Sequence, residues 1–241
     1  MSAMLGQTAR RLILPLTSPV GSIRTVTTPT PQVVLTYDDG PVPEDTPGVL
    51  SALSDAGATA TFFVLVARAE RNPSLLGEIV DAGHEVALHG IDHVRLTTLS
   101  PGEVLRRTRE GKERLEQMLG APVRWFRPPY GAQQPATWAA IRRCGLESVV
   151  WNRTGYDWQD DPVGEVAERT LAGASAGDVI LMHDGHAGLD VGVDDGPAPG
   201  FSREGLARAV LGGLAERGLA PVSLGEAVGT GKAVKGAWFR K

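Results

Sequence analysis

Short apolar runs alternate with amphipathic segments along most of the chain. The runs are nearly continuous in aliphatic, β-branched and aromatic residues, as is typical of parallel strands buried on both faces. Seven runs are predicted as strands, at residues 33–37, 60–66, 85–88, 123–126, 148–151, 179–182 and 221–224. The segments between them have helical patterns, and a regular alternation of strand and helix predicts a parallel sheet.

The predicted helices share a start signal in which a polar residue precedes a proline. Asn72-Pro73 and Ser100-Pro101 are two examples, and Glu103 completes a capping box with Ser100. This order suits an N-cap followed by the first helical position, where the missing N–H of proline costs nothing. The alternation therefore predicts an α/β fold, a closed or nearly closed barrel whose functional loops lie on one face.

Candidate chemistry falls directly after the predicted strands. Asp38 and Asp39 follow the first strand, and His89 and His93 follow the third. Two histidines four positions apart can lie on one helical or turn face and bind the same ion. One carboxylate of the aspartate pair can complete a His-His-Asp metal site, which leaves the other available as a general base. This set predicts a metal-dependent hydrolase.

Further polar residues follow the later strands. Arg127 follows the fourth strand, Asp157 and Trp158 follow the fifth, and His183 follows the sixth. Each pattern taken singly also fits ordinary structure, such as an Asp-Asp-Gly turn or a loop stiffened by two prolines. Their common placement on one face of the barrel is stronger evidence for a functional site than any single motif.

Composition narrows the function classes. The chain has 241 residues and a formal net charge of −4, which fits one α/β barrel domain. It has no basic stripe interleaved with aromatic residues, so nucleic acid is not expected as a partner. No segment reaches the roughly 18 to 20 apolar residues of a membrane span. Cys144 is the only cysteine, so no internal disulfide can form.

The ends of the chain are predicted to lie outside the catalytic domain. Residues 1–31 are predicted as an irregular arm or extension, 32–228 as the catalytic domain and 229–241 as a tail. Arg10 and Arg11 precede an apolar run that is shorter than the roughly 7 to 15 residues of a signal-peptide core, and no clear cleavage site follows. A cytoplasmic location is therefore expected, with export by an atypical N-terminal signal as the alternative.

Taken in order, the motifs resemble those of the polysaccharide deacetylases, carbohydrate esterase family four with its NodB-homology domain. The matching pieces are Thr36-Tyr37-Asp38-Asp39-Gly40, His89-x-x-x-His93, Arg127-x-Pro129-Tyr130, Asp157-Trp158 and Leu181-x-His183. The resemblance as a whole spans roughly residues 32–224. The resemblance implies a single-domain distorted (β/α) barrel with about seven parallel strands. It also implies a hydrolase that removes N-acetyl groups from an amino sugar in a polysaccharide or oligosaccharide.

The resemblance assigns the metal site and the base. Asp39, His89 and His93 are expected to bind one divalent ion, with zinc favoured over cobalt or another divalent ion. Asp38 is expected to be the general base, and Arg127 is expected to position its carboxylate. An ion with three protein ligands and open positions can bind both water and a substrate carbonyl.

The resemblance also assigns the acid and the substrate pocket. His183 is expected to be the general acid, with Asp157 orienting its imidazole. The backbone N–H of Tyr130 is expected to stabilise the oxyanion. Trp158 and Leu181 are expected to enclose the methyl of the acetyl group. Histidine suits the acid role because an amine leaves only when protonated, near neutral pH.

One position departs from the family pattern. The family usually has Ser or Thr after the first metal histidine, whereas this chain has Gly90. Without that hydroxyl, weaker metal binding or a less ordered loop is expected. Asp92 is expected to be a solvated turn carboxylate. The Gly-rich acidic stretch at 184–200 is a candidate for substrate contact, since a loop that long is usually functional or disordered, and its role is not predicted.

Three alternatives to a polysaccharide deacetylase remain open at the sequence level. One is an intracellular N-deacetylase or deacylase of a small glycoconjugate or secondary metabolite, favoured by the weak export signal. A second is an inactive sugar-binding domain, which would need neither Asp38 nor His183. A third is a His-His-carboxylate iron oxygenase, in which an adjacent base and a distant acid have no role. Oligomeric state is not predicted.

Overall fold

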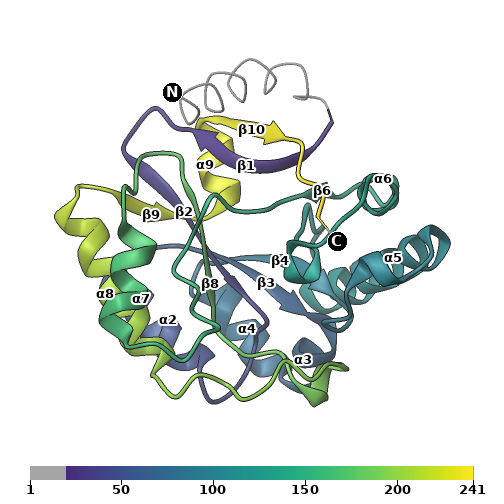
Figure 1. Ribbon diagram of the computed structural model, residues 1–241, viewed down its shortest axis with the longest axis horizontal. Helices are drawn as coiled ribbons and strands as arrows, with labels where there is room; N and C mark the ends of the chain where they lie inside the picture. Colours follow the sequence, from purple (N-terminus) through teal and green to yellow (C-terminus); the bar gives the residue numbers. More distant parts are fainter. Residues whose placement is uncertain (1–19, 241) are drawn as a thin grey trace, which may run out of the picture.

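A curled parallel sheet surrounded by helices forms the centre of the molecule (Figure 1). The computed structural model describes residues 20–240. Seven strands follow one another across the sheet in the order β6-β5-β4-β3-β2-β8-β7, and β9 pairs separately with β2. The strands are β2 Gln32–Asp38, β3 Thr61–Leu65, β4 Glu85–Gly90, β5 Trp125–Phe126, β6 Glu147–Ser148, β7 Arg153–Thr154, β8 Val179–His183 and β9 Ala220–Val222. The predicted α/β class and the curled sheet of about seven parallel strands are confirmed.

Helices connect the strands and cover the outside of the sheet (Figure 1). They are α2 Thr46–Asp55, α3 Val66–Arg71, α4 Pro73–Asp81, α5 Pro101–Leu119, α6 Pro135–Arg143, α7 Val163–Leu171, α8 Arg203–Glu216 and α9 Leu224–Thr230. The predicted cap of α5 is present, since the side chain of Ser100 accepts a hydrogen bond from the Glu103 N–H. None of the helices within residues 20–240 is long and apolar enough to cross a membrane.

Alternation along β2 separates a packing face from a functional face. Val33, Leu35 and Tyr37 pack with the helices in the outer core. The intervening side chains point inward, because successive residues of a strand face opposite sides of the sheet. Thr36 and Asp38 on this inner face are buried, and both bond to Arg127. Strand β2 therefore places the Asp38 carboxylate inside the barrel.

The predicted extent of the fifth strand is wrong. The run at 148–151 was expected to be one strand, but β6 ends at Ser148. The Val150 N–H bonds to the Ile23 carbonyl at 2.8 Å, and Val149 bridges Ile23. The chain therefore leaves the sheet to pair with an N-terminal strand and rejoins the sheet at β7.

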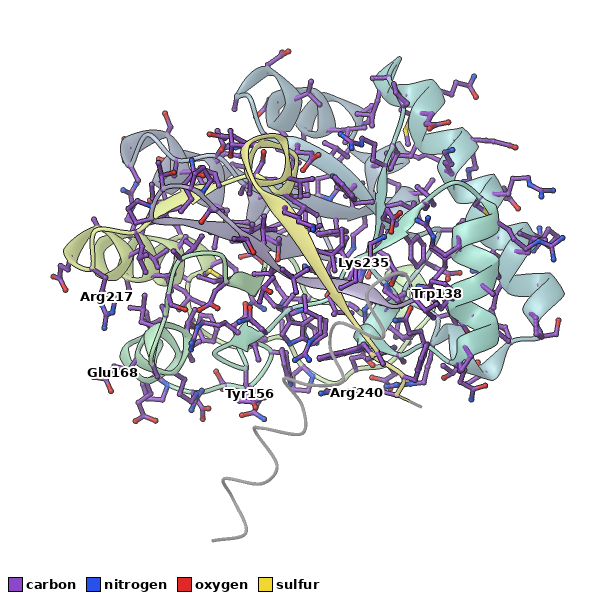
Figure 2. The ribbon with its side chains drawn as sticks, turned by 90° about the horizontal axis from the view of Figure 1, so that it is seen from above. Trp138, Tyr156, Glu168, Arg217, Lys235 and Arg240 are labelled. Atoms are coloured by element: carbon purple, nitrogen blue, oxygen red, sulfur yellow. The ribbon has the colours of Figure 1, made fainter. Side chains whose placement is uncertain are left out.

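Two terminal strands close one side of the barrel. β1 Ser22–Thr27 pairs antiparallel with β10 Lys232–Gly236. The prediction of an irregular arm is therefore wrong for Ser22–Thr27, while residues 1–19, with Arg10 and Arg11, lie outside the described residues. In Figure 2 the label of Lys235 marks β10, and its ammonium is 2.7 Å from Glu147 of β6. The predicted domain boundaries stay a prediction.

Candidate active site

The turn after β2 directs two neighbouring carboxylates into one cleft. In a regular strand Asp38 and Asp39 would face opposite sides of the sheet. Asp39 instead has a φ of +78°, in the left-handed region, and both side chains line the same cleft. The Gly40 N–H bonds to the Asp184 carboxylate at 3.2 Å, and the Arg68 guanidinium donates to the Asp39 carbonyl at 3.0 Å. These contacts hold the turn in its unusual conformation.

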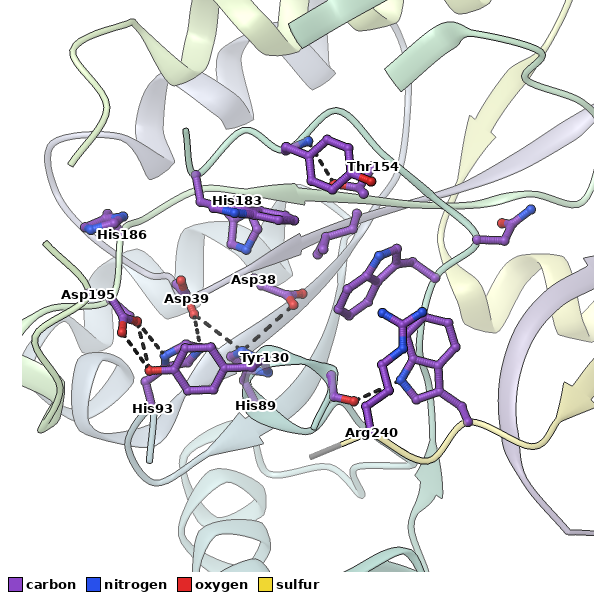
Figure 3. A pocket seen from close by; sticks show the side chains of 18 of the residues that line it. Asp38, Asp39, His89, His93, Tyr130, Thr154, His183, His186, Asp195 and Arg240 are labelled. Carbon is purple, nitrogen blue, oxygen red and sulfur yellow. Dashed lines mark hydrogen bonds and ion pairs between the residues drawn. The ribbon is translucent and has the colours of Figure 1, made fainter. Parts of the chain in front are cut away.

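Asp39, His89 and His93 form a buried cluster of metal-ligand atoms, here called the donor cluster, that is suited to one metal ion (Figure 3). The Asp39 Oδ1 atom lies 3.4 Å from His89 Nε2 and 3.4 Å from His93 Nε2. Two ligands bonded tetrahedrally at about 2.1 Å to one ion would themselves be about 3.4 Å apart. Asp39 Oδ1 is buried and has no hydrogen-bond donor within residues 20–240, a costly state that a cation would relieve. The donor set therefore fits one divalent ion.

A backbone carbonyl orients one histidine of the cluster, and a carboxylate lies near the other. His89 Nδ1 lies 2.8 Å from the Arg127 carbonyl, which can only accept, so Nε2 carries the free lone pair. His93 Nδ1 lies 3.3 Å from an Asp195 carboxylate oxygen. Burial lowers the pKa of His93, so its ring is neutral at pH 7, the form that binds a metal. Both rings are therefore prepared as ligands.

The loop carrying His93 is braced without a hydroxyl at position 90. The Asp92 carboxylate accepts a bond of 2.5 Å from Arg107 and one of 3.3 Å from the Val94 N–H. The His93 N–H donates to the Val191 carbonyl at 3.1 Å. The prediction that Asp92 is merely solvated is therefore wrong. Gly90 has a φ of +132°, and a Cβ there would lie 2.8 Å from the Asp92 carbonyl oxygen.

A buried ion pair fixes Asp38. The Arg127 guanidinium lies 2.6 Å from Asp38 Oδ1 and 2.8 Å from the Thr36 hydroxyl. Arg127 is fully buried and packs on the ring of Phe63, 4.1 Å from its centroid. Burial lowers the pKa of Arg127, and the adjacent Asp38 opposes this shift. The second oxygen of Asp38 lies 3.8 Å from His89 Nε2, beside the donor cluster.

His183 is held by Asp157 on the other side of the cleft. Asp157 accepts from His183 Nδ1 at 2.8 Å and from the His183 backbone N–H at 2.8 Å. The Arg203 guanidinium donates a hydrogen bond of 3.1 Å to Asp157 Oδ2. Burial by itself would lower the pKa of His183, but Asp157, with help from Asp39 and Asp38, raises it to about 9. The imidazole is therefore protonated at neutral pH.

Eight of the ten predicted site residues line one cleft of about 600 Å³, and the other two support it. Arg127 and Asp157 lie behind the wall, where they contact Asp38 and His183. Trp158 is 38% exposed and presents its ring at a right angle to His183, with centroids 5.6 Å apart. The structure thus brings all ten together, while their individual roles stay predictions. The lining residues among them are Asp38, Asp39, His89, His93, Tyr130, Trp158, Leu181 and His183.

Sequence reasoning missed the residues that attach the 184–200 loop to the site. Arg68 binds both carboxylate oxygens of Asp190, at 2.9 and 2.8 Å, as well as the Asp39 carbonyl. Asp195 accepts from the Tyr130 hydroxyl at 2.8 Å and faces His93. One signal for Arg68 was available, since it stands between two alanines in the first turn of α3, directly after a buried apolar strand.

Comparisons with known proteins agree with this geometry. The family model for polysaccharide deacetylase matches residues 25–149. A peptidoglycan-N-acetylglucosamine deacetylase of Bacillus cereus is 32% identical over 155 residues, which cover 64% of this chain and 72% of that protein. A chitooligosaccharide deacetylase of Sinorhizobium fredii is 36% identical over 156 residues, covering 64% of this chain and 73% of that protein.

A solved structure is similar over most of the chain. The family 4 carbohydrate esterase from Streptomyces lividans, in complex with acetate, is 28% identical with a TM-score of 0.69. The match covers 85% of this chain and 97% of that one. The likeness therefore extends over a larger part of the chain than the family model matches.

Gly90→Ser is expected to destabilise the protein by about 1 to 3 kcal/mol, because the left-handed backbone and the Asp92 carbonyl leave no room for Cβ. Urea unfolding measures the change. Gly77→Ser is the matched control, since Gly77 lies in helix α4 with nothing within 4 Å of its Cβ position. A stable Gly90→Ser protein that binds metal more tightly would show that the missing hydroxyl does weaken the site.

Proposed function

The chain belongs to the polysaccharide deacetylase family, and we propose that it removes N-acetyl groups from N-acetylglucosamine units of a glycan. It is a hydrolase of carbon–nitrogen bonds other than peptide bonds. The observation that carries the proposal is one cleft with a metal-type donor cluster, a fixed carboxylate and a protonated histidine. The relatives, by their names, act on peptidoglycan and chitooligosaccharides, which both contain N-acetylglucosamine.

The ion proposed for Asp39, His89 and His93 is zinc. Two imidazoles and one carboxylate form a common catalytic zinc site, whereas magnesium and calcium favour oxygen ligands. Cobalt is the main alternative, since it accepts the same donors. When bound, the ion supplies Lewis acidity toward the amide carbonyl and lowers the pKa of water.

The chain's own residues would move the protons. Asp38 accepts a proton from the attacking water at the carboxylate that Arg127 holds in place. His183 donates a proton from Nε2, since Asp157 occupies Nδ1, and the nitrogen of the breaking C–N bond receives it. The products are acetate and the free amino sugar. The backbone N–H of Tyr130 is proposed to stabilise the oxyanion, and Trp158 and Leu181 would keep water from the acetyl methyl.

The alternatives receive less support. An inactive sugar-binding domain has no need for the buried Asp38–Arg127 pair or for the Asp157–His183 pair. An iron oxygenase has no step for either pair. A small intracellular substrate is the second candidate, and it goes with the proposal of a cytoplasmic location.

A mass-spectrometric screen tests the function directly. The zinc-loaded protein is incubated with N-acetylglucosamine oligomers, peptidoglycan fragments, acetylated xylan and small N-acetylated metabolites. Loss of acetyl groups from the first two classes is expected, and the Asp38→Asn protein serves as the inactive control. Deacetylation confined to small metabolites would favour the alternative substrate class, and no deacetylation at all would contradict the proposal.

The two neighbouring aspartates should differ in what they lose on substitution. Asp38→Asn should retain bound zinc and lose roughly 10²-fold or more in kcat, as expected for a general base. Asp39→Asn should lose metal affinity, by at least the roughly 10- to 100-fold seen when even a supporting contact is removed. Zinc content by mass spectrometry and kcat are measured together. Swapped phenotypes would reverse the two roles.

The pH profile should report the His183–Asp157 pair. Asp157 raises the pKa of His183 and favours the protonated acid, so the rate should fall as pH rises through that pKa. Asp157→Asn removes the charge that stabilises the imidazolium, so the alkaline limb should move to lower pH. Glu168→Gln, on the exposed face of α7, is the control and should leave the profile unchanged.

Substrate chemistry separates a proton donor from a structural residue. An activated ester needs little protonation of its leaving group, so His183→Ala should slow ester hydrolysis far less than amide hydrolysis. Equal losses on both substrates would exclude the acid role.

A further inference from the structure

One end of the cleft carries basic and aromatic side chains that the proposed mechanism does not use. Arg240 and Trp238 from the C-terminal segment line the same cleft as Asp38 and His183. In Figure 3, Arg240 and Asp195 lie on opposite sides of the cleft, and Asp38 and Asp39 lie between them. The cleft is therefore polarised, with the Asp195 carboxylate at one end and the guanidiniums of Arg240 and Arg24, both over the Trp238 ring, at the other.

Hydrogen bonds fix the C-terminal segment against the loop that follows Arg127. The Arg240 N–H donates to the Gln133 carbonyl at 2.9 Å, and the Gln133 side chain donates to the Trp238 carbonyl at 2.8 Å. The indole N–H of Trp238 donates to the Gly131 carbonyl at 2.9 Å. Gln133 is fully buried. The backbone that carries Arg240 is thus part of the cleft wall.

The guanidinium of Arg240 is preorganised by stacking. Its central carbon lies 3.8 Å from the centroid of the buried Trp238 ring, and Trp151 packs against that ring with centroids 5.6 Å apart. Within residues 20–240, the interactions found for Arg240 are this stacking and its backbone hydrogen bond. Stacking uses the face of a guanidinium and leaves its N–H edge available, in the planar fork that matches a carboxylate.

We propose that Trp151, Trp238 and Arg240 form a subsite for a carboxylate carried by the sugar next to the reacting N-acetyl group. The inference rests on the proposed function and selects among its substrates. It favours an acidic glycan, such as a peptidoglycan strand whose stem peptides have been removed so that every second sugar carries a free lactyl carboxylate, over a neutral chitin oligomer. Asp195 at the opposite end would repel the same carboxylate, so the glycan would lie in one direction across the cleft.

Matched glycans isolate the carboxylate. One substrate is a peptidoglycan tetrasaccharide stripped of peptide, with its lactyl carboxylates free; the second is the same molecule with those carboxylates converted to amides. The third is the neutral N-acetylglucosamine tetramer. Acetate release gives kcat/KM for each, and intact peptide-bearing fragments show whether stem-peptide carboxylates can replace the lactyl group.

The native protein should prefer the free carboxylate over the amide by about 10-fold, the size of one charge-assisted hydrogen bond in an accessible site. High salt should reduce that preference. Arg240→Gln should abolish it and leave the rate on the neutral tetramer nearly unchanged. Arg240→Lys keeps the positive charge but lacks the planar pair of N–H groups, so it should retain only part of the preference for the free carboxylate.

Arg217→Gln is the control, because it removes one positive charge from a site that Figure 2 shows at the left edge of the molecule, away from Arg240. It should keep the full preference. Equal rates of the native protein on the acid and the amide, or an undiminished preference in Arg240→Gln, would overturn the subsite while the deacetylase function stands. Failure of the native protein to deacetylate any of the glycans would overturn the proposed function, and the subsite with it.

Discussion

The buried contact between Arg127 and Asp38 is the interaction on which the rest of the site depends. Arg127 holds Asp38 with its side chain and orients His89 with its backbone carbonyl, so one residue positions both the proposed base and a metal ligand. Removing one partner of a buried ion pair typically costs about 3 to 5 kcal/mol, because the other charge is left unpaired. The Asp38 carboxylate that faces Arg127, together with the Thr36 hydroxyl, therefore stabilises its charge in the core.

Around this pair, distant segments are joined by polar contacts instead of apolar packing. Arg68 links the turn at Asp39 to Asp190, and Asp195 on the same loop faces the ring of His93. The 184–200 loop has few buried apolar residues, with Ala187 and Val191 packed against Leu65. Its order and the geometry of the donor cluster are consequently supported by the same charged groups, so a bound ion would stabilise the loop as well as the cluster.

The sequence predicted the site well because the carboxyl ends of parallel strands meet at one edge of a sheet. Residues separated by more than a hundred positions, such as Asp38 and His183, could be assigned to one cleft because each follows a predicted parallel strand, and the structure pairs those two strands. The pairing of β1 with β10 was not predictable in the same way. Both strands are short and partly polar, and their register depends on a partner at the other end of the chain. The brace at Asp92 was missed because Arg107 lies on the following helix, in contact only after folding.

The central claim is that Asp39, His89 and His93 bind one ion while Asp38 stays free of it. Crystals soaked with zinc and measured on both sides of the zinc absorption edge would locate the ion independently of activity. The account predicts one anomalous peak at bonding distance, about 2.0 to 2.2 Å, from Asp39 Oδ1 and the Nε2 atoms of both histidines. A peak bonded to Asp38 in place of Asp39, or no peak at this cluster at saturating zinc, would contradict it.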